Sequence, residues 1–294
     1  MAGLKHSFEY AAARTIAAAA GLLSPRAADR FGAALGTLTY HLLSSRRIVA
    51  HDNIKSTIGQ NLSEKEIEKL SKKVFQNIGR TIIEIARFSQ VKLEGARKII
   101  VSDHAGILKK VHDEGKGGII LTAHFGNWEL LGSWPATAGY PMHFLVGTQH
   151  NSKVDRMLTK FRRAMGVEII PLDRQIKSVF KVLKENEFVG VAADQHAPVG
   201  IKVKFLGRDA LYARGPALFS IRTGAPICPF LIRREAYDRH VITAHEPIYP
   251  PNSGDEEKDI HTMTQSYAKF FEAGIRHYPD QWMWTHRRWK LESS

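Results

Sequence analysis

From residue 118 onward, short apolar runs alternate with helix-like segments. The runs cover residues 118–123, 142–147, 167–171, 188–193 and 227–232, and residues 241–244 are a further strand candidate. Between them, residues 154–165 and 175–185 have the apolar spacing of helices. Buried runs that alternate with helices in this way are typical of βαβ units. The sequence therefore predicts an α/β fold with a mixed, largely parallel sheet flanked by helices.

The first of these runs leads into residues 121–132, which read Leu-Thr-Ala-His-Phe-Gly-Asn-Trp-Glu-Leu-Leu-Gly. His124 falls at the carboxyl end of the predicted strand, in the turn before a helix that starts near Asn127 and that Pro135 or Gly139 ends. Glu129 lies within the first turns of that helix. The turn thus places one histidine and one carboxylate close together in the chain.

The five-residue spacing of His124 and Glu129 limits how they can meet. On one continuous helix they would point about 140° apart. A bend before the helix lets the imidazole fold back onto the carboxylate instead. A carboxylate on one ring nitrogen fixes the tautomer and raises the basicity of the other nitrogen, which a general base requires. Gly126 is expected to leave room for a substrate beside the pair.

Three further polar groups are candidates for the same site. Asp194 and Gln195 follow the run 188–193 directly, and open α/β sheets bind ligands beyond the carboxyl ends of their strands. Asp194 either hydrogen-bonds a substrate or orients a basic group, although an aspartate in this place can also simply cap a turn. Arg162 ends a basic cluster with Lys160 and Arg163; it either belongs to a solvated helix face or pairs with a phosphate or thioester oxygen through its planar guanidinium.

Two basic segments later in the chain suit an anionic ligand. Arg214 precedes Gly215 and Pro216, which open a helix whose free backbone N–H groups can hold an anion, although the same residues would serve merely as a helix start. Between residues 202 and 208 three basic residues alternate with Val203 and Phe205 in a predicted hairpin. Its basic face and its apolar face together would fit a phosphorylated lipid.

The charge balance favours anionic partners. The 42 Lys and Arg against 29 Asp and Glu give a net charge of +13, which suits nucleic acid, acidic lipid headgroups or an acidic carrier protein. The sequence has no zinc-finger spacing, no aromatic-and-basic RNA signature and no heptad run, so nucleic acid is not expected as a partner. The single cysteine, Cys228, excludes a disulfide framework and fits a reducing compartment.

The first 45 residues predict two helices. The apolar segments 10–23 and 31–43 are separated by Ser24 and Pro25, and each is shorter than the roughly 18 to 20 apolar residues of a spanning helix. Glu9, Arg14 and the lack of a cleavage site argue against a signal peptide. The helices either belong to the core or also touch a bilayer, with their cations toward anionic headgroups: Lys5, Arg14, Arg26, Arg30, Arg46 and Arg47.

We therefore expect a membrane-associating helical region at residues 1–45 and a single α/β domain at 46–294. Within the latter, Ser63 and Glu66 form a predicted capping box at the start of an amphipathic helix.

Residues 122–129, Thr-Ala-His-Phe-Gly-Asn-Trp-Glu, resemble the HxxxxE form of the HxxxxD/E motif of the late acyltransferases of lipid A biosynthesis. This family includes lauroyl and myristoyl transferases and belongs to the lysophospholipid acyltransferase-like superfamily. The resemblance extends along nearly the whole chain, with further landmarks in the family's order: Arg46-Arg47, Asn53-Ile54, Arg162, Asp194-Gln195, Phe205-Leu206-Gly207, Gly215-Pro216-Ala217 and residues 284–290.

The resemblance implies an O-acyltransferase that works without a metal or other cofactor. Its donor would be an acyl carrier protein thioester or acyl-coenzyme A, and its acceptor a hydroxyl of a lipid A precursor at the cytoplasmic face of the inner membrane. His124 would act as general base and Glu129 would orient it. The expected substrate-binding residues are Asn127, Arg162, Asp194, Gln195 and Arg214.

Three alternatives stay open. Related enzymes acylate phosphatidylinositol mannosides, and several landmarks belong to both branches. A metal-dependent hydrolase would use His124, Glu129, Asp194 and His196, but the sequence lacks an HExxH or similarly dense ligand cluster. A non-catalytic protein that binds anionic lipid would also explain the positive charge.

Overall fold

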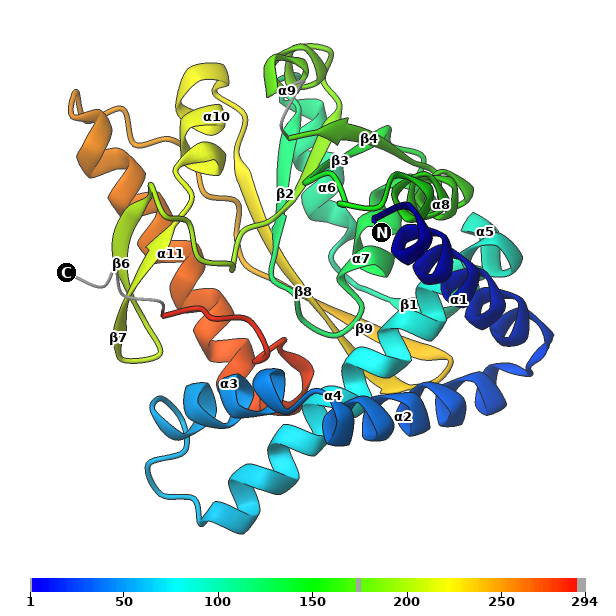
Figure 1. Ribbon diagram of the computed structural model, residues 1–294. Helices are drawn as coiled ribbons and strands as arrows, with labels where there is room; N and C mark the ends of the chain where they lie inside the picture. The colour runs from blue at the N-terminus through cyan, green and yellow to red at the C-terminus, as the bar shows by residue number, and fades with distance from the viewer. Residues whose placement is uncertain (1, 173–175, 290–294) are drawn as a thin grey trace.

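The structure is a computed structural model that describes residues 2–172 and 176–289. Its centre is a seven-stranded sheet with the order β1-β9-β8-β2-β5-β3-β4 (Figure 1). The neighbouring strands are parallel except for the antiparallel pair β8 and β9. The strands are β1 (Ile100–Val101), β2 (Gly118–Thr122), β3 (Met142–Val146), β4 (Val167–Pro171), β5 (Phe188–Ala192), β8 (Ile227–Ala236) and β9 (Arg239–Ala244). The predicted mixed, largely parallel α/β sheet is confirmed.

Helices cover both faces of this sheet because its central strands are apolar on both sides. The fully buried strand β2 points Ile119 and Leu121 to one face and Ile120 to the other. The first face packs on α9 (Ile176–Lys184), α10 (Gly215–Thr223) and α11 (Glu256–His277), and the second on α5 (Phe88–Ile99), α6 (Ala105–Asp113), α7 (Trp128–Thr137) and α8 (Ser152–Ala164). The predicted helices 154–165 and 175–185 are confirmed as α8 and α9, with residue 175 outside the described residues.

The helix after the histidine turn ends next to Gly139, the later of the two predicted ends. The helix starts after Asn127, close to the predicted start, with Asn127 as its N-cap, and it continues past Pro135 to Thr137. Pro135 sits late enough in α7 that its missing N–H costs one bond and the last turn still closes. The predicted hairpin is also present, as β6 (Ile201–Phe205) and β7 (Arg208–Tyr212), with Val203 and Phe205 buried beside α11.

The N-terminal helices pack onto the rest of the chain. They are α1 (Ala2–Leu22), α2 (Pro25–Leu42) and α3 (Ser44–Lys55), and they lie against α4 (Glu64–Ala86) and α8 (Figure 1). Ser63 and Glu66 form the predicted capping box of α4. Gly36 of α2 meets α4 so closely that a Cβ there would lie 2.2 Å from the carbonyl oxygen of Phe75. The helices are thus part of the core, while their predicted membrane contact and the boundary at residue 45 stay predictions.

None of the described helices combines the length and the apolar character needed to cross a bilayer. This agrees with the shortness of the apolar segments 10–23 and 31–43 in the sequence.

Candidate active site

Two neighbouring strands bring His124 and Asp194 together at the carboxyl edge of the sheet. Thr122 of β2 pairs with Ala192 of β5, so His124 and Asp194 each lie two residues beyond a paired position. The Nδ1 atom of His124 is 2.7 Å from Oδ1 of Asp194. The backbone N–H of His124 donates to Oδ2 of the same carboxylate at 2.9 Å. The carboxylate that orients the imidazole is therefore that of Asp194.

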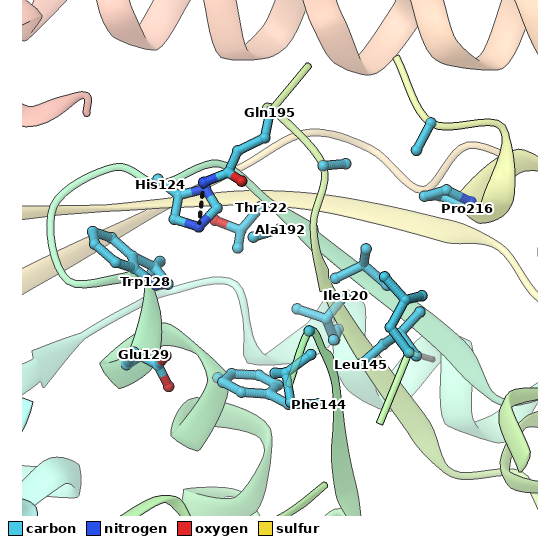
Figure 2. A pocket seen from close by; sticks show the side chains of 18 of the residues that line it. Ile120, Thr122, His124, Trp128, Glu129, Phe144, Leu145, Ala192, Gln195 and Pro216 are labelled. Carbon is cyan, nitrogen blue, oxygen red and sulfur yellow. Dashed lines mark hydrogen bonds between the residues drawn. The ribbon is translucent and has the colours of Figure 1, made fainter. Parts of the chain in front are cut away.

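Both oxygens of the Asp194 carboxylate accept hydrogen bonds. Its side chain is only 3% exposed, and Oδ2 also accepts a hydrogen bond from Nε1 of Trp282 at 2.7 Å. With three donors on one carboxylate, Nδ1 of His124 is held as the N–H end of the ring, and Nε2 carries the lone pair. Nε2 lies 3.4 Å from the side-chain nitrogen of Gln195, which is a long hydrogen bond (Figure 2). This tautomer is the one a general base needs.

Burial and mutual attraction together determine the pKa values of His124 and Asp194. Burial alone lowers the pKa of His124, but the negative charge and hydrogen bond of Asp194, with a smaller contribution from Glu129, outweigh it and raise the pKa above its ordinary value of 6.5. Burial likewise raises the pKa of Asp194, and the charge of His124 together with the donors on the carboxylate brings it below its ordinary value. The carboxylate is therefore ionised at neutral pH.

The expectation that Glu129 orients His124 is wrong in its geometry. Glu129 instead forms a bidentate ion pair with Arg162 of α8, with Nε to Oε2 at 2.9 Å and Nη2 to Oε1 at 2.6 Å. Both side chains are about nine-tenths buried, at 9% and 11% exposed. Glu129 lies in the first turn of α7, and in the view of Figure 2 it appears below His124 and Trp128. The pair fixes Arg162 at the wall of the site.

Asn127 is also placed differently from the prediction. It is fully buried, its side-chain oxygen caps α7 by accepting from the N–H of Leu130 at 3.0 Å, and its side-chain nitrogen donates to Glu84 at 2.7 Å. Glu84 in turn pairs with Arg234 of β8. Asn127 therefore joins α7 to α4 and to the sheet, and both ends of its side chain are used in the fold rather than on a substrate.

Gly126 shapes the turn and does not open space for a substrate, contrary to the expectation. Its φ is +56°, and a Cβ would lie 1.9 Å from the carbonyl oxygen of Ile232. Its N–H donates to the carbonyl of Gln281 at 2.8 Å, and its carbonyl accepts from the hydroxyl of Thr81 at 2.9 Å. Only glycine adopts this conformation without strain against the neighbouring strand.

We predict that Gly126→Ala destabilises the protein. The left-handed backbone alone costs about 1–3 kcal/mol, and the clash with Ile232 adds to it. Denaturant unfolding measures the change, with Gly106→Ala in α6 as the control because no atom lies within 4 Å of a Cβ there. We expect the control to be neutral or slightly stabilising. Equal stability of Gly126→Ala and wild type would contradict the role assigned to the turn.

The site opens into a cavity of about 490 Å³. Its polar end is formed by His124, Glu129, Arg162 and Gln195. Its remaining wall is largely apolar, with Ile120, Phe144 and Leu145 grouped away from the imidazole (Figure 2). The loops after β2, β3 and β5 all contribute, as expected for the carboxyl edge of a parallel sheet. The arrangement places the imidazole of His124 beside a largely apolar cavity.

The predicted site residues thus divide into three groups. Glu129, Arg162 and Gln195 line the cavity with His124, and Asp194 lies behind the imidazole. Arg214 does not line the cavity, although its neighbours Ala213 and Gly215 do, because its guanidinium forms an ion pair with Glu257 of α11. Asn127 lies outside the cavity, in the buried contact between α7 and α4.

Sequence reasoning missed two contributors. Trp282, in the aromatic segment near residue 284, donates to the carboxylate of Asp194. Phe144 lines the cavity from β3, where the apolar character of the strand was visible but not the face to which each residue points.

Metal-ligating atoms come together elsewhere in the described part of the chain. The side chains of His6, Glu9 and His150 bring their ligand atoms within 4.8 Å of one another, at the contact of α1 with the loop before α8. Among the residues searched, His124 belongs to no such group. The imidazole and Glu129 instead have separate partners, Asp194 and Arg162.

Comparisons with known proteins show which family the chain resembles along its length. The family described as bacterial lipid A biosynthesis acyltransferase matches residues 7–291. A phosphatidylinositol mannoside acyltransferase of Mycolicibacterium smegmatis is 27% identical over 189 residues, which cover 62% of this chain and 60% of that protein. The lipid A biosynthesis lauroyltransferase of Escherichia coli K12 is 24% identical over 269 residues, covering 89% and 84%. The lipid A biosynthesis palmitoleoyltransferase of the same organism is 24% identical over 265 residues, covering 88% and 83%.

The match to the mycobacterial relative spans about three fifths of that protein's length, whereas the family match runs through almost the entire chain. The histidine turn, the strand with Asp194 and the helix with Arg162 all lie inside the family match. The chain belongs to the bacterial lipid A biosynthesis acyltransferase family.

Proposed function

We propose that this protein transfers a fatty acyl group from a thioester, carried by acyl carrier protein, to a hydroxyl of a lipid A precursor. The observation that carries the proposal is the His124–Asp194 pair at the polar end of an apolar cavity. A base with a fixed tautomer suits deprotonation of a hydroxyl, and the apolar slot suits a fatty acyl chain. Family membership supports the same class of reaction.

In the proposed reaction Nε2 of His124 removes the proton of the acceptor hydroxyl as its oxygen attacks the thioester carbonyl. The new C–O bond forms, and the electron pair of the carbonyl moves to its oxygen. When the carbonyl re-forms, the C–S bond breaks and the imidazolium returns its proton to the leaving thiolate. Asp194 stabilises the imidazolium between the two steps, as its contact with Nδ1 allows. No covalent acyl-enzyme is needed.

The oxyanion requires a hydrogen-bond donor close to His124. The N–H of Gly126 in the histidine turn is already bonded to the carbonyl of Gln281. The side-chain nitrogen of Gln195 lies 3.4 Å from Nε2 of His124 and lines the cavity. We assign it to the oxyanion, because an entering hydroxyl replaces its long bond to the imidazole and frees the amide to donate. Arg162, anchored by Glu129, adds positive charge to the same wall.

The apolar part of the cavity is the proposed site of the acyl chain, and Phe144 shapes it. The ring of Phe144 lies against Gly132 of α7, where a Cβ would come within 1.5 Å of it, and against Gly190 of β5. The ring therefore fills the space that two absent side chains leave between the helix and the sheet. A smaller residue at position 144 would extend the slot inward.

We predict that Phe144→Leu shifts the preference toward longer acyl donors. Each additional buried CH₂ contributes about 0.8 kcal/mol, which corresponds to roughly a fourfold gain in kcat/KM for each carbon accommodated. Rates with a series of acyl-carrier-protein thioesters measure the shift. Phe271→Leu is the control, because Phe271 of α11 is fully buried but does not line the cavity. An unchanged chain-length profile in Phe144→Leu would show that the chain binds elsewhere.

The proposed place of action is the cytoplasmic face of the inner membrane. The N-terminal helices expose large apolar side chains, with Leu22 90%, Leu42 68% and Ile48 58% accessible. Arg26, Arg30 and Arg46 are exposed on the same helices. Apolar side chains flanked by cations suit helices that lie on an anionic bilayer. Flotation with phosphatidylglycerol vesicles tests this, and loss of flotation in Leu42→Ser/Ile48→Ser is the expected result; undiminished flotation of that variant would place the contact elsewhere.

The identity of the acceptor is tested by incubating the protein with two alternative lipids. Purified protein is incubated with acyl-carrier-protein thioesters or acyl-coenzyme A and with either a lipid A precursor or a phosphatidylinositol mannoside. We expect the lipid A precursor to gain the mass of one acyl group. A gain confined to the mannoside would move the protein to the other branch, and no gain with any donor would favour a lipid-binding protein without catalysis.

A further inference from the structure

A basic groove lies between α1 and α8, on the side of α8 away from the candidate active site. It has a volume of about 580 Å³. Its cations are Arg14, Lys153, Arg156 and Lys160, and its floor is formed by Tyr10, Ala17, Met157 and Phe161. We refer to this set, with Ser89, as the α1–α8 groove. The predicted basic cluster at residues 160–163 is thus divided, because Lys160 lines this groove and Arg162 lines the cavity of the candidate active site.

The placement of these cations follows from helical spacing. Lys153, Arg156 and Lys160 are separated by three and four residues, so they share one stripe of α8. Arg162 follows Lys160 by two residues, which turns it about 200° around the helix, and it reaches Glu129 in the cavity. The single helix α8 therefore contributes side chains to both the groove and the cavity of the candidate active site. Because a helix with its side chains is about 10–12 Å wide, the groove lies roughly that far from the catalytic cavity.

The groove gathers four cations in one recess, and none of the four has a carboxylate partner among the described residues. Some exposed cations elsewhere are paired with carboxylates, as in Arg163–Glu168, Lys204–Asp209 and Arg276–Glu272. In the described part of the chain, Arg156 and Lys160 form no ion pair. Arg14 and Lys153 lie over the ring of Tyr10 at 5.9 and 6.0 Å.

The carboxylates of α1 and of the first turn of α8 have other partners. Glu9 accepts from the side chain of Asn151, and Asp155 accepts from the N–H of Gln149. Four cations without a carboxylate in a recess between two helices concentrate positive potential there. Such a recess is built for a multiply charged anion, and phosphate matches it because each oxygen can take a separate donor.

We propose that the α1–α8 groove binds a phosphate group on the headgroup of the lipid acceptor, which rests on the acyl transfer proposed above. The apolar floor and Tyr10 suit the sugar carrying the phosphate. The neighbouring side chains point to a lipid rather than to a soluble donor: α1 itself exposes Phe8 and Leu22, at 76% and 90% accessible. A lipid acceptor whose phosphate is bound in the groove reaches across the width of α8 and presents its hydroxyl to His124.

The first test measures binding directly and does not depend on turnover. Glucose 1-phosphate and glucose are titrated into isotopically labelled protein, and the backbone amide signals of residues 153–161 are followed by NMR. We expect saturable shifts with glucose 1-phosphate, none with glucose, and weakening at higher salt. The same titration of Arg156→Gln/Lys160→Gln should lose the shifts. Absence of shifts in wild type, or equal shifts in the double variant, would overturn the proposal.

The second test distinguishes acceptor from donor. In acyl transfer, Arg156→Gln/Lys160→Gln should raise the KM for the phosphorylated acceptor about tenfold or more, with the donor KM within twofold of wild type. Lys177→Gln/Lys184→Gln on α9 removes two exposed cations away from the groove and should match wild type. A rise confined to the donor KM would assign the groove to the donor's phosphate and contradict the proposal. If no acyl transfer occurs with any substrate, the proposed function fails, while the titration still decides whether the groove binds phosphate.

Discussion

His124→Ala is expected to lower kcat/KM for acyl transfer by about 10²- to 10⁴-fold, the usual contribution of a positioned general base. The substitution removes the lone pair at Nε2 but leaves the cavity, Arg162 and Gln195 in place. Because His124 is part of a turn held by backbone hydrogen bonds from Met283 and to Asp194, the fold should persist. Steady-state rates with saturating donor measure the loss.

His261→Ala is the matched control for this prediction. His261 is an exposed histidine of α11 and is expected to leave the rate unchanged. Lipid binding by His124→Ala should also be retained, since the exposed cations and apolar side chains of α1 to α3 are untouched. A rate for His124→Ala within a few fold of wild type would remove His124 from the chemistry.

Asp194→Asn is expected to lower kcat/KM by a comparable factor, about 10²- to 10⁴-fold. The carboxylate accepts from three N–H groups, two of His124 and one of Trp282. An asparagine offers one acceptor oxygen and one NH₂ group, so its NH₂ would face a donor. If it faces Nδ1 of His124, the imidazole is driven to the other tautomer, and Nε2 becomes the N–H end. The lost negative charge also weakens support for the imidazolium.

The pH dependence separates this effect from simple damage to the fold. In the proposed reaction the neutral imidazole of His124 is the base, so kcat/KM should rise with pH as His124 loses its proton, with a midpoint above 6.5 because the pKa is raised. Burial, which lowers this pKa, remains in Asp194→Asn, while the main attraction that raises it is lost. The midpoint should therefore move to lower pH in that variant.

Glu129→Gln is the comparison for the pH profile. The charge of Glu129 contributes less than that of Asp194 to the raised pKa of His124, so the midpoint should move less. Its main effect is to leave Arg162 without its partner, which costs roughly 3–5 kcal/mol of stability for a buried pair. A larger shift of the midpoint in Glu129→Gln than in Asp194→Asn would restore Glu129 as the residue that orients the base.

Local patterns in the sequence were enough to predict the sheet and the place of His124 at its carboxyl edge. The apolar runs of β2 and β5 are short and bounded by turn residues, so both strands and the polar residues that follow them could be assigned. The partner of His124 could not, because the choice between Glu129 and Asp194 depends on which strands are neighbours. β2 and β5 lie side by side in the sheet although His124 and Asp194 are 70 residues apart.

The contacts made by the histidine turn also could not be predicted from the local sequence. Gly126 and Asn127 read as substrate-facing residues because they follow the histidine, but α4 and the segment with Gln281 close over them. The lining of the cavity depends on the same long-range packing, since the ring of Phe144 reaches Gly132 and Gly190 from a third element. Sequence periodicity shows that a strand is buried, but not which helix packs against each residue.

The most direct test of the central claim is the mass of the lipid after incubation of a lipid A precursor and an acyl-carrier-protein thioester with wild type or His124→Ala. We predict that wild type adds the mass of one acyl group to the lipid and that His124→Ala adds almost none in the same time. An equal gain with both proteins, or consumption of the thioester without any gain in lipid mass, would contradict acyl transfer by His124.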